Sequence, residues 1–224
     1  MTRNNGSAVA ELPSTLPPEQ IGEQLVVPSL QIKQVTLKIV GESSLIVHAW
    51  SEKAKTMMRD KQQKKGSAGK EVRNPQADFE SSLYVVDPSV PTYGFPAIAF
   101  KGAAVNAALQ VDAKKTQTRI AFHVVNGVAT PQGDLVPLRY DELRMREDMV
   151  RVGMGTADLR YRGEFVNWSC DLAIRYNSRA ISLEQLVTLF NAAGFGVGVG
   201  EWRPERDGMN GRFRVAELVD GASN

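Results

Sequence analysis

The sequence predicts an α+β fold in which helices cover one face of an antiparallel sheet. Two patterns carry this prediction. Apolar residues alternate with polar ones at 32–39 and again at 168–176, as they do in half-buried strands. A helical period runs through 182–194, where one apolar stripe repeats every three to four residues.

The other elements follow in order along the chain. Strands are expected at 32–39, 43–50, 82–86, 119–127, 134–140, 168–176 and 211–218, and helices at 97–111 and 182–193. On the strand at 168–176 one face would carry Cys170, Leu172, Ile174 and Tyr176. This order is compatible with a decorated ferredoxin-like or RRM-like core.

The helix at 182–193 has the clearest signals at both ends. Ser182 and Gln185 have the spacing of a capping box, and Gly194 stands where a C-terminal cap glycine belongs. The stripe to be buried consists of Leu183, Leu186, Val187 and Phe190. On the last strand Phe213 and Val215 should point inward.

Composition excludes several classes of protein. The net charge is +2, so any basic surface must be local. A single cysteine excludes a disulfide framework, and with only His48 and His123 beside it neither a zinc site nor a cofactor is expected. No apolar run is long enough to span a membrane, and the N-terminus lacks the apolar core of a signal peptide, so we expect a cytoplasmic protein.

The chain divides into an arm, one domain and a tail. Residues 1–30 should be a flexible arm, 31–219 a single domain, and 220–224 a flexible tail. The segment 51–75 holds eight Lys or Arg against three acids, with Ser51 as the cap of a first helical half and a loop around Lys70. This segment is either a solvated charged face or a surface for a partner.

The stretch 192–213, "AAGFGVGVGEWRPERDGMNGRF", is not a nucleotide-binding loop. Val199 or Glu201 stands where a G-x-G-x-x-G fingerprint needs its third glycine, and the stretch follows a helix instead of a strand. Glycines permit close approach to a phosphate backbone or to another segment of the protein. In the first case Phe195, Val197 and Val199 would anchor the loop. In the second, Glu201, Glu205 and Asp207 would pair with its arginines in a turn that closes the domain.

Three segments together resemble the RAMP superfamily of CRISPR-associated proteins, and within it the backbone subunit that polymerises along guide RNA. They are "TLKIVGESSLIVHAW", "FPAIAFKGAAVNAAL" with Lys101 and Gly102 at the family's Lys-Gly position, and "LVTLFNAAGFGVGVGEWRPERDGMNGRFRV". Asn106 departs from the family, whose helix often carries arginine there. A phage-borne or stand-alone relative is also compatible with these segments.

The resemblance implies a modified ferredoxin-like/RRM-like core that carries a large finger/thumb insertion at about 51–96. It also implies that the N-terminal arm straps neighbouring subunits together, and it adds Lys101, at a helix start, as a phosphate contact. The candidate nucleic-acid-binding residues are Trp50, Lys53, Lys55, Arg59, Lys64, Lys65, Lys101, Arg160, Tyr161, Arg162, Trp202, Arg203, Arg206 and Arg212. The arginines of 139–164 alternate with acids, so pairing with these acids is expected of them more than contact with nucleic acid. Tyr161 is the residue to test for stacking on a base.

We therefore expect a non-catalytic protein that binds single-stranded RNA or DNA and oligomerises along the strand as a filament or ring. One alternative is an RNA endonuclease of the same fold, with His48, Asp60 or Asp78 as its reactive residue. Another is a phage structural or inhibitory protein that engages other protein subunits, such as those of an effector complex.

Overall fold

The computed structural model describes residues 29–50, 74–152 and 156–219, together with residues 56, 59, 62 and 63. Met1–Leu30 and Gln31–Asn224 form separate units, and the fold is that of the second unit. Residues 1–28 of the expected arm, most of the basic segment 51–73 and the tail at 220–224 lie outside the described residues.

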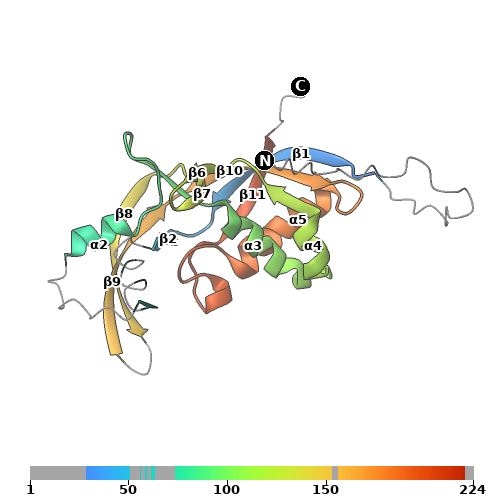
Figure 1. Ribbon diagram of the computed structural model, residues 1–224. Coiled ribbons are helices and arrows are strands. Elements are labelled where there is room, and N and C mark those ends of the chain that lie inside the picture. Colours follow the sequence, from blue (N-terminus) through green and yellow to red (C-terminus); the bar gives the residue numbers. More distant parts are fainter. Residues whose placement is uncertain are drawn as a thin grey trace, which may run out of the picture. The chain divides into compact units, whose positions relative to one another are not determined.

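A four-stranded antiparallel sheet with two helices forms the core. Its elements are β1 (Ile32–Gly41), α3 (Ala97–Ala107), β5 (Phe122–Val124), β10 (Ser169–Asn177), α5 (Leu183–Ala192) and β11 (Phe213–Val219). The strand order across the sheet is β11-β1-β10-β5, which, with the chain order β-α-β-β-α-β, is the ferredoxin-like arrangement. Figure 1 shows α3 and α5 on one side of this sheet. The predicted fold class is confirmed.

The strand registers explain why one face of the sheet is buried. Leu37 lies opposite Leu172, and Ile39 lies opposite Cys170, so apolar pairs from β1 and β10 share the helix-facing side. All four are fully buried. Phenylalanines complete the core, with the ring centroids of Phe122 on β5 and Phe190 on α5 5.6 Å apart.

Two insertions decorate this core and pair with each other. The first carries β2 (Leu45–Val47), α2 (Pro75–Ser81), β3 (Val85–Asp87) and β4 (Thr92–Pro96), and the second carries β6 (Val128–Thr130), β7 (Gly133–Pro137), β8 (Glu142–Val152) and β9 (Thr156–Val166). One small sheet has the order β3-β4-β7-β6 and the other β2-β9-β8, so each joins strands from both insertions. The single finger/thumb insertion expected at 51–96 is not confirmed, because β4 is hydrogen-bonded to β7 of the second insertion.

The β8–β9 hairpin is the longest paired segment of the described chain, and its two faces differ. One face interleaves arginines and acids, with Arg146 Nε 2.8 Å from Asp148 Oδ1. The opposite face exposes Met145, Met149 and Leu159 by 50%, 73% and 40%. This hairpin therefore has a self-paired charged face and a second face on which exposed apolar side chains alternate with Glu147 and Arg151.

The strand predicted at 119–127 is only half right. Residues up to Ala121 belong to a helix, α4 (Lys115–Ala121), which follows the 3-10 turn η2 (Ala108–Val111), and the strand β5 begins at Phe122. The strand was predicted because Ile120 seemed to belong to an alternation of apolar and polar residues. Its side chain is instead 77% exposed on the surface of α4.

The end of α5 also differs from expectation. Its capping box is present, as Ser182 and Gln185 predict. Gly194, however, does not end the helix in a left-handed conformation, since the chain continues in a π-helical turn, η3 (Ala193–Val197), and Gly198 has the positive φ of 70°. Gly194 is required for another reason, because a Cβ there would collide with the backbone carbonyl of Phe213.

Candidate nucleic-acid groove

A groove of about 310 Å³ lies between α3 and the glycine-rich segment that follows α5. Its lining residues are His48, Tyr84, Phe95, Pro96, Ala99, Gly102, Ala103, Asn106, Val197, Gly198, Val199, Gly200, Glu201, Arg203 and Glu205. We call it the α3 groove. Its volume is at the small end of ligand sites, which suits a single base.

The wall formed by α3 is open because its exposed positions are small. Ala99, Gly102, Ala103 and Asn106 follow the i, i+3, i+4, i+7 spacing of one helix face. Above Gly102 the space is empty, since a Cβ built there would meet no atom within 4 Å. A larger side chain at position 102 would therefore fill the groove without displacing neighbouring atoms of the protein.

The opposite wall is held together by its own glycines. A Cβ at Gly200 would collide with the carbonyl of Ile46, and one at Gly211 with the carbonyl of Val199. Val199 N also donates to Gly211 O at 2.9 Å. These glycines are needed where the segment crosses itself and β2, so the geometry favours the turn that closes the domain over a cradle for phosphate.

The anchoring side chains of this segment are Val197 and Val199, which are 4% and 2% exposed. Phe195, expected to be a third anchor, is instead 73% exposed. It points outward because the π-helical turn places it on the outside of the bend.

One polar cluster on the groove joins α3, α4 and the glycine segment. Arg203 donates to Glu205 Oε2 at 3.0 Å and to the carbonyl of Gly200 at 3.0 Å. Asn106 Nδ2 donates to Glu205 Oε1 at 2.9 Å, and Lys115 Nζ donates to Asn106 Oδ1 at 3.3 Å. Arg203 is thus held by Glu205, as the alternative of a salt-bridged turn predicts.

A second polar cluster surrounds Arg162, whose side chain is only 2% exposed. Its guanidinium contacts Asp148 Oδ2 at 3.2 Å, Glu201 Oε2 at 3.6 Å and His48 Nδ1 at 3.1 Å. Because its charge is buried and already paired, Arg162 is poorly placed for the nucleic-acid contact expected of it. It joins the hairpin to the groove instead.

The same cluster fixes the protonation of His48. A guanidinium can only donate, so His48 Nδ1 must accept, and the ring proton of the neutral imidazole lies on Nε2. Burial and the positive charge of Arg162 lower the pKa of His48. Because His48 therefore lacks a free basic nitrogen toward the groove, it is poorly placed to act as a general base.

Two exposed tryptophans are close in sequence to residues that line the groove. Trp50, two residues after His48, is 55% exposed, and Trp202, between Glu201 and Arg203, is 41% exposed. Trp202 has a positive φ of 53°, a conformation disfavoured for a large aromatic residue. Both side chains offer exposed aromatic surface on which a base could stack.

The other predicted contacts are dispersed. Lys53, Lys55, Lys64 and Lys65 lie outside the described residues, while Arg59 and Arg206 are exposed. Arg212 is half-buried, with Nε 3.3 Å from the carbonyl of Met209.

On the hairpin, Arg160 Nε lies 3.7 Å from Asp158 Oδ2. Tyr161 is half-buried and lies opposite Glu147 on the other face of the hairpin, so it does not share a face with Arg160 and Arg162. These three residues therefore do not form one contact surface.

Lys101 lies in the second turn of α3 and not at its start, since the helix begins at Ala97. Its Nζ is 3.1 Å from His123 Nδ1 and 6.0 Å from the centroid of the Phe122 ring. Partial burial and the nearby charge of Arg119 lower the pKa of Lys101. Lys101 is thus directed toward β5 and does not line the α3 groove.

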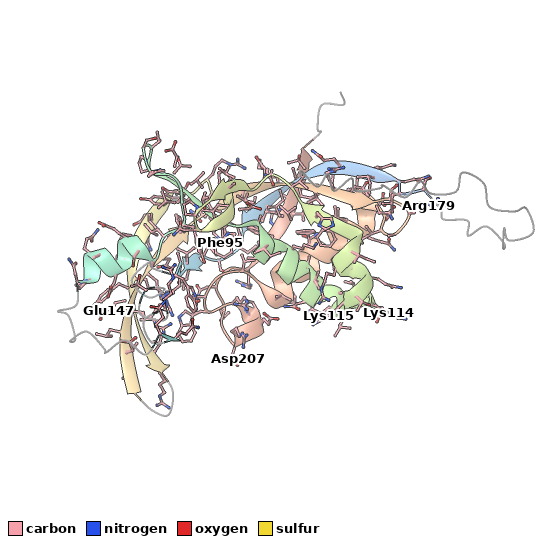
Figure 2. The ribbon with its side chains drawn as sticks, in the orientation of Figure 1. Phe95, Lys114, Lys115, Glu147, Arg179 and Asp207 are labelled. Atoms are coloured by element: carbon pink, nitrogen blue, oxygen red, sulfur yellow. The ribbon has the colours of Figure 1, made fainter. Side chains whose placement is uncertain are left out.

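Sequence reasoning missed the cations of α4, which are Lys114, Lys115 and Arg119. The signal was available, because Asp112 is the only acid between Asp87 and Asp134. Figure 2 shows Lys114 and Lys115 together where α4 begins.

The groove itself is better suited to a base than to a phosphate. Glu201 and Glu205 are 44% and 32% exposed, and their carboxylate oxygens can accept hydrogen bonds from the amino groups of bases, while their pairing with Arg162 and Arg203 engages those arginines. Asn106 adds an amide, and the alanines and glycine of α3 add a flat apolar wall.

Other kinds of site find no support in the part of the chain that the structure describes. Those residues contain no group of three or more His, Cys, Asp or Glu placed to hold a metal ion. Burial raises the pKa of the Cys170 thiol, which makes it unreactive. No described helix has the length and apolar character required to cross a bilayer.

Comparisons with known proteins give structural neighbours only. No protein-family model matches the chain, and no curated protein matches it. The crystal structure of Cmr6 from Pyrococcus furiosus is similar with a TM-score of 0.37 and 14% identity, over 84% of this chain and 100% of that one. A chain of the type III-B Cmr-beta complex, solved by cryo-EM bound to cognate target RNA, is similar with a TM-score of 0.43 and 8% identity, over 84% of this chain.

This chain spans 60% of the length of that Cmr-beta chain. Since both TM-scores are below 0.5, the function must be argued from the residues of the chain itself.

Proposed function

We propose that this protein binds single-stranded nucleic acid without cleaving it, and that the α3 groove receives one unstacked base of the strand. The observation that carries the proposal is the open wall above Gly102, which faces amide and carboxylate groups. A base has an apolar face for the wall and amino groups for the acceptors. Trp50 and Trp202 supply further stacking surface, worth about 1–3 kcal/mol per base.

The cleaving alternative is less well supported by the groove. An endonuclease that used His48 as general base would need an unprotonated nitrogen directed at the ribose hydroxyl. His48 Nδ1 already accepts a hydrogen bond from Arg162 Nε, and the ring proton is on Nε2. We therefore assign His48 a structural role, which a cleavage assay of the wild type and of His48→Ala tests directly. Cleavage that is lost in this variant while binding is kept would establish the endonuclease instead.

The first test fills the groove. Gly102→Leu places a side chain in the empty space above α3, at a helix position where leucine is well tolerated. We expect affinity for single-stranded RNA or DNA to fall about tenfold or more, because the base loses its wall and its stacking. Fluorescence anisotropy with labelled oligonucleotides across a salt series measures this loss of affinity.

Gly102→Ala is the matched control, since one methyl group in this space leaves most of the groove open. Its affinity should stay near that of the wild type. Equal affinity of Gly102→Leu and Gly102→Ala would show that the strand does not enter the groove.

We further propose that copies of the protein assemble along the strand. The face of the β8–β9 hairpin that exposes Met145, Met149 and Leu159 supports an interface with a neighbouring copy. Burial of this face would give the contact between copies that a filament or ring needs.

A further inference from the structure

The described cations are distributed in two different ways. On the charged face of the hairpin arginines and acids are paired, as Arg146 has Asp148 at 2.8 Å and Glu164 at 3.6 Å. Around α4 the cations Lys101, Lys114, Lys115 and Arg119 gather without such partners. Within the described residues no carboxylate lies at ion-pair distance from any of these four.

Like charges crowded on one surface destabilise a folded protein unless an anion offsets them. Lys101 illustrates the crowding, because its Nζ finds only the neutral acceptor His123 Nδ1, at 3.1 Å. Lys114 and Arg119 are exposed, so their charges face solvent. Neither α3 nor α4 carries an acid in its first turn.

This cationic surface is connected to the α3 groove. Lys115 donates to Asn106 Oδ1 at 3.3 Å, and Asn106 is part of the groove lining. A nucleotide whose base lies against α3 would therefore have its sugar and phosphate within reach of α4. The arginine that lines the groove, Arg203, is already paired with Glu205, so it is less available to a phosphate than the cations around α4.

We infer that the phosphate backbone of the strand is bound by α4, through Lys114, Lys115 and Arg119, with Lys101 behind them, and not by the glycine-rich segment. This inference rests on the proposed function, because it assigns the phosphates of the strand whose base occupies the groove. The ligand class is a phosphodiester chain, either RNA or DNA.

The test removes three positive charges from α4 in the full chain, as Lys114→Gln, Lys115→Gln and Arg119→Gln. A matched control removes three paired arginines, as Arg139→Gln, Arg144→Gln and Arg214→Gln, whose side chains are 56%, 53% and 55% exposed. Each triple variant changes the formal net charge from +2 to −1, since 2 − 3 = −1. Affinity for a labelled oligonucleotide is measured from low to high salt.

We expect the α4 variant to lose on the order of 100-fold in affinity at about 0.1 M salt. Its salt slope should fall by about 2, since each phosphate contact on a single strand contributes about 0.7. The control variant should bind within about threefold of the wild type. Equal losses in both triples, or an unchanged slope for the α4 variant, would overturn the inference while leaving the groove proposal intact.

Two other outcomes separate this inference from the proposed function. If the wild type binds no oligonucleotide even at low salt, the proposed function fails and the inference fails with it. If the α4 triple instead abolishes binding to anionic phospholipid vesicles and leaves oligonucleotide binding unchanged, the cations serve a membrane surface and the inference is wrong.

Discussion

Arg162 is the residue on which the hairpin and the groove both depend. It is almost fully buried, and its guanidinium contacts Asp148, Glu201 and His48 on three different segments. A buried charge is tolerated only when paired, and removal of one partner leaves the others desolvated and uncompensated. The alternation of arginine and acid in this part of the sequence gave no sign that one arginine differs from the rest.

We expect Arg162→Gln to lower the free energy of unfolding by about 3–5 kcal/mol, because Asp148 would remain buried without its partner. Arg160→Gln, two residues earlier on β9, is the matched control. Its side chain is 35% exposed and lies 3.7 Å from Asp158, so it should cost less than about 1 kcal/mol. Urea denaturation of the two variants compares them, and similar costs would mean that Arg162 is not the centre of the cluster.

At the scale of elements, the π-helical turn after α5 decides how the glycine-rich segment reaches the groove. The turn carries the chain past Gly194, which lies against the carbonyl of Phe213 at the start of β11. A side chain at this point would push the last strand away from α5. Glycine at 194 thus serves the packing of two elements, and glycine at 198 serves the backbone conformation.

Gly194→Ala should lower the free energy of unfolding by about 2–3 kcal/mol, since the methyl group meets backbone that cannot move aside. Gly102→Ala should instead raise it by about 0.5–1 kcal/mol, because alanine is favoured in a helix interior and the space is open. Thermal or chemical unfolding of both variants checks this difference in sign. A neutral Gly194→Ala would contradict the close approach to Phe213.

The elements that could be predicted from the sequence are those with a strong local period. The core strands 32–39 and 168–176 and the helix at 182–193 show their buried faces directly in the order of residues. The β8–β9 hairpin was not recognised as a hairpin, since it interleaves charges on one face and carries methionines on the other. Its strand pairing depends on contacts between residues such as Glu142 and Val166, which no local period reveals.

The site was less predictable than the fold for a similar reason. The α3 groove arises where residues from 48, 84, 95–106 and 197–205 meet, and these segments are far apart in the chain. Sequence reasoning left two alternatives for Arg203, a phosphate contact or a salt-bridged turn, and only the structure shows that Glu205 holds the arginine. The cations of α4 were overlooked because their significance lies in the absence of nearby acids, a property of the folded surface.

For the whole molecule, the two surfaces assigned here have separate tasks, strand binding at α3–α4 and contact between copies at the hairpin. Substitution of Met149→Gln, together with Met145→Gln, removes apolar area from the hairpin face. We expect assembly on long single strands to weaken, while binding of a short oligonucleotide that holds one copy stays unchanged. Sedimentation velocity with long and short strands distinguishes a loss of assembly from a loss of strand binding.

Met209→Gln is the control for this experiment, because Met209 is 72% exposed and Met149 is 73% exposed. It should assemble like the wild type. If the hairpin variant also assembles normally, the neighbouring copy contacts a different surface.

The strand order of the core has a consequence for how the chain is made. β1 emerges from the ribosome first, but its two partners in the sheet are β10 at Ser169–Asn177 and β11 at Phe213–Val219. Both edges of β1 therefore stay unpaired until β10 has been synthesised, and one of them stays unpaired until β11 has followed. Partners so distant in sequence slow folding through the cost of closing the intervening chain. The nascent protein must accordingly be protected from pairing β1 with other chains until these strands are available.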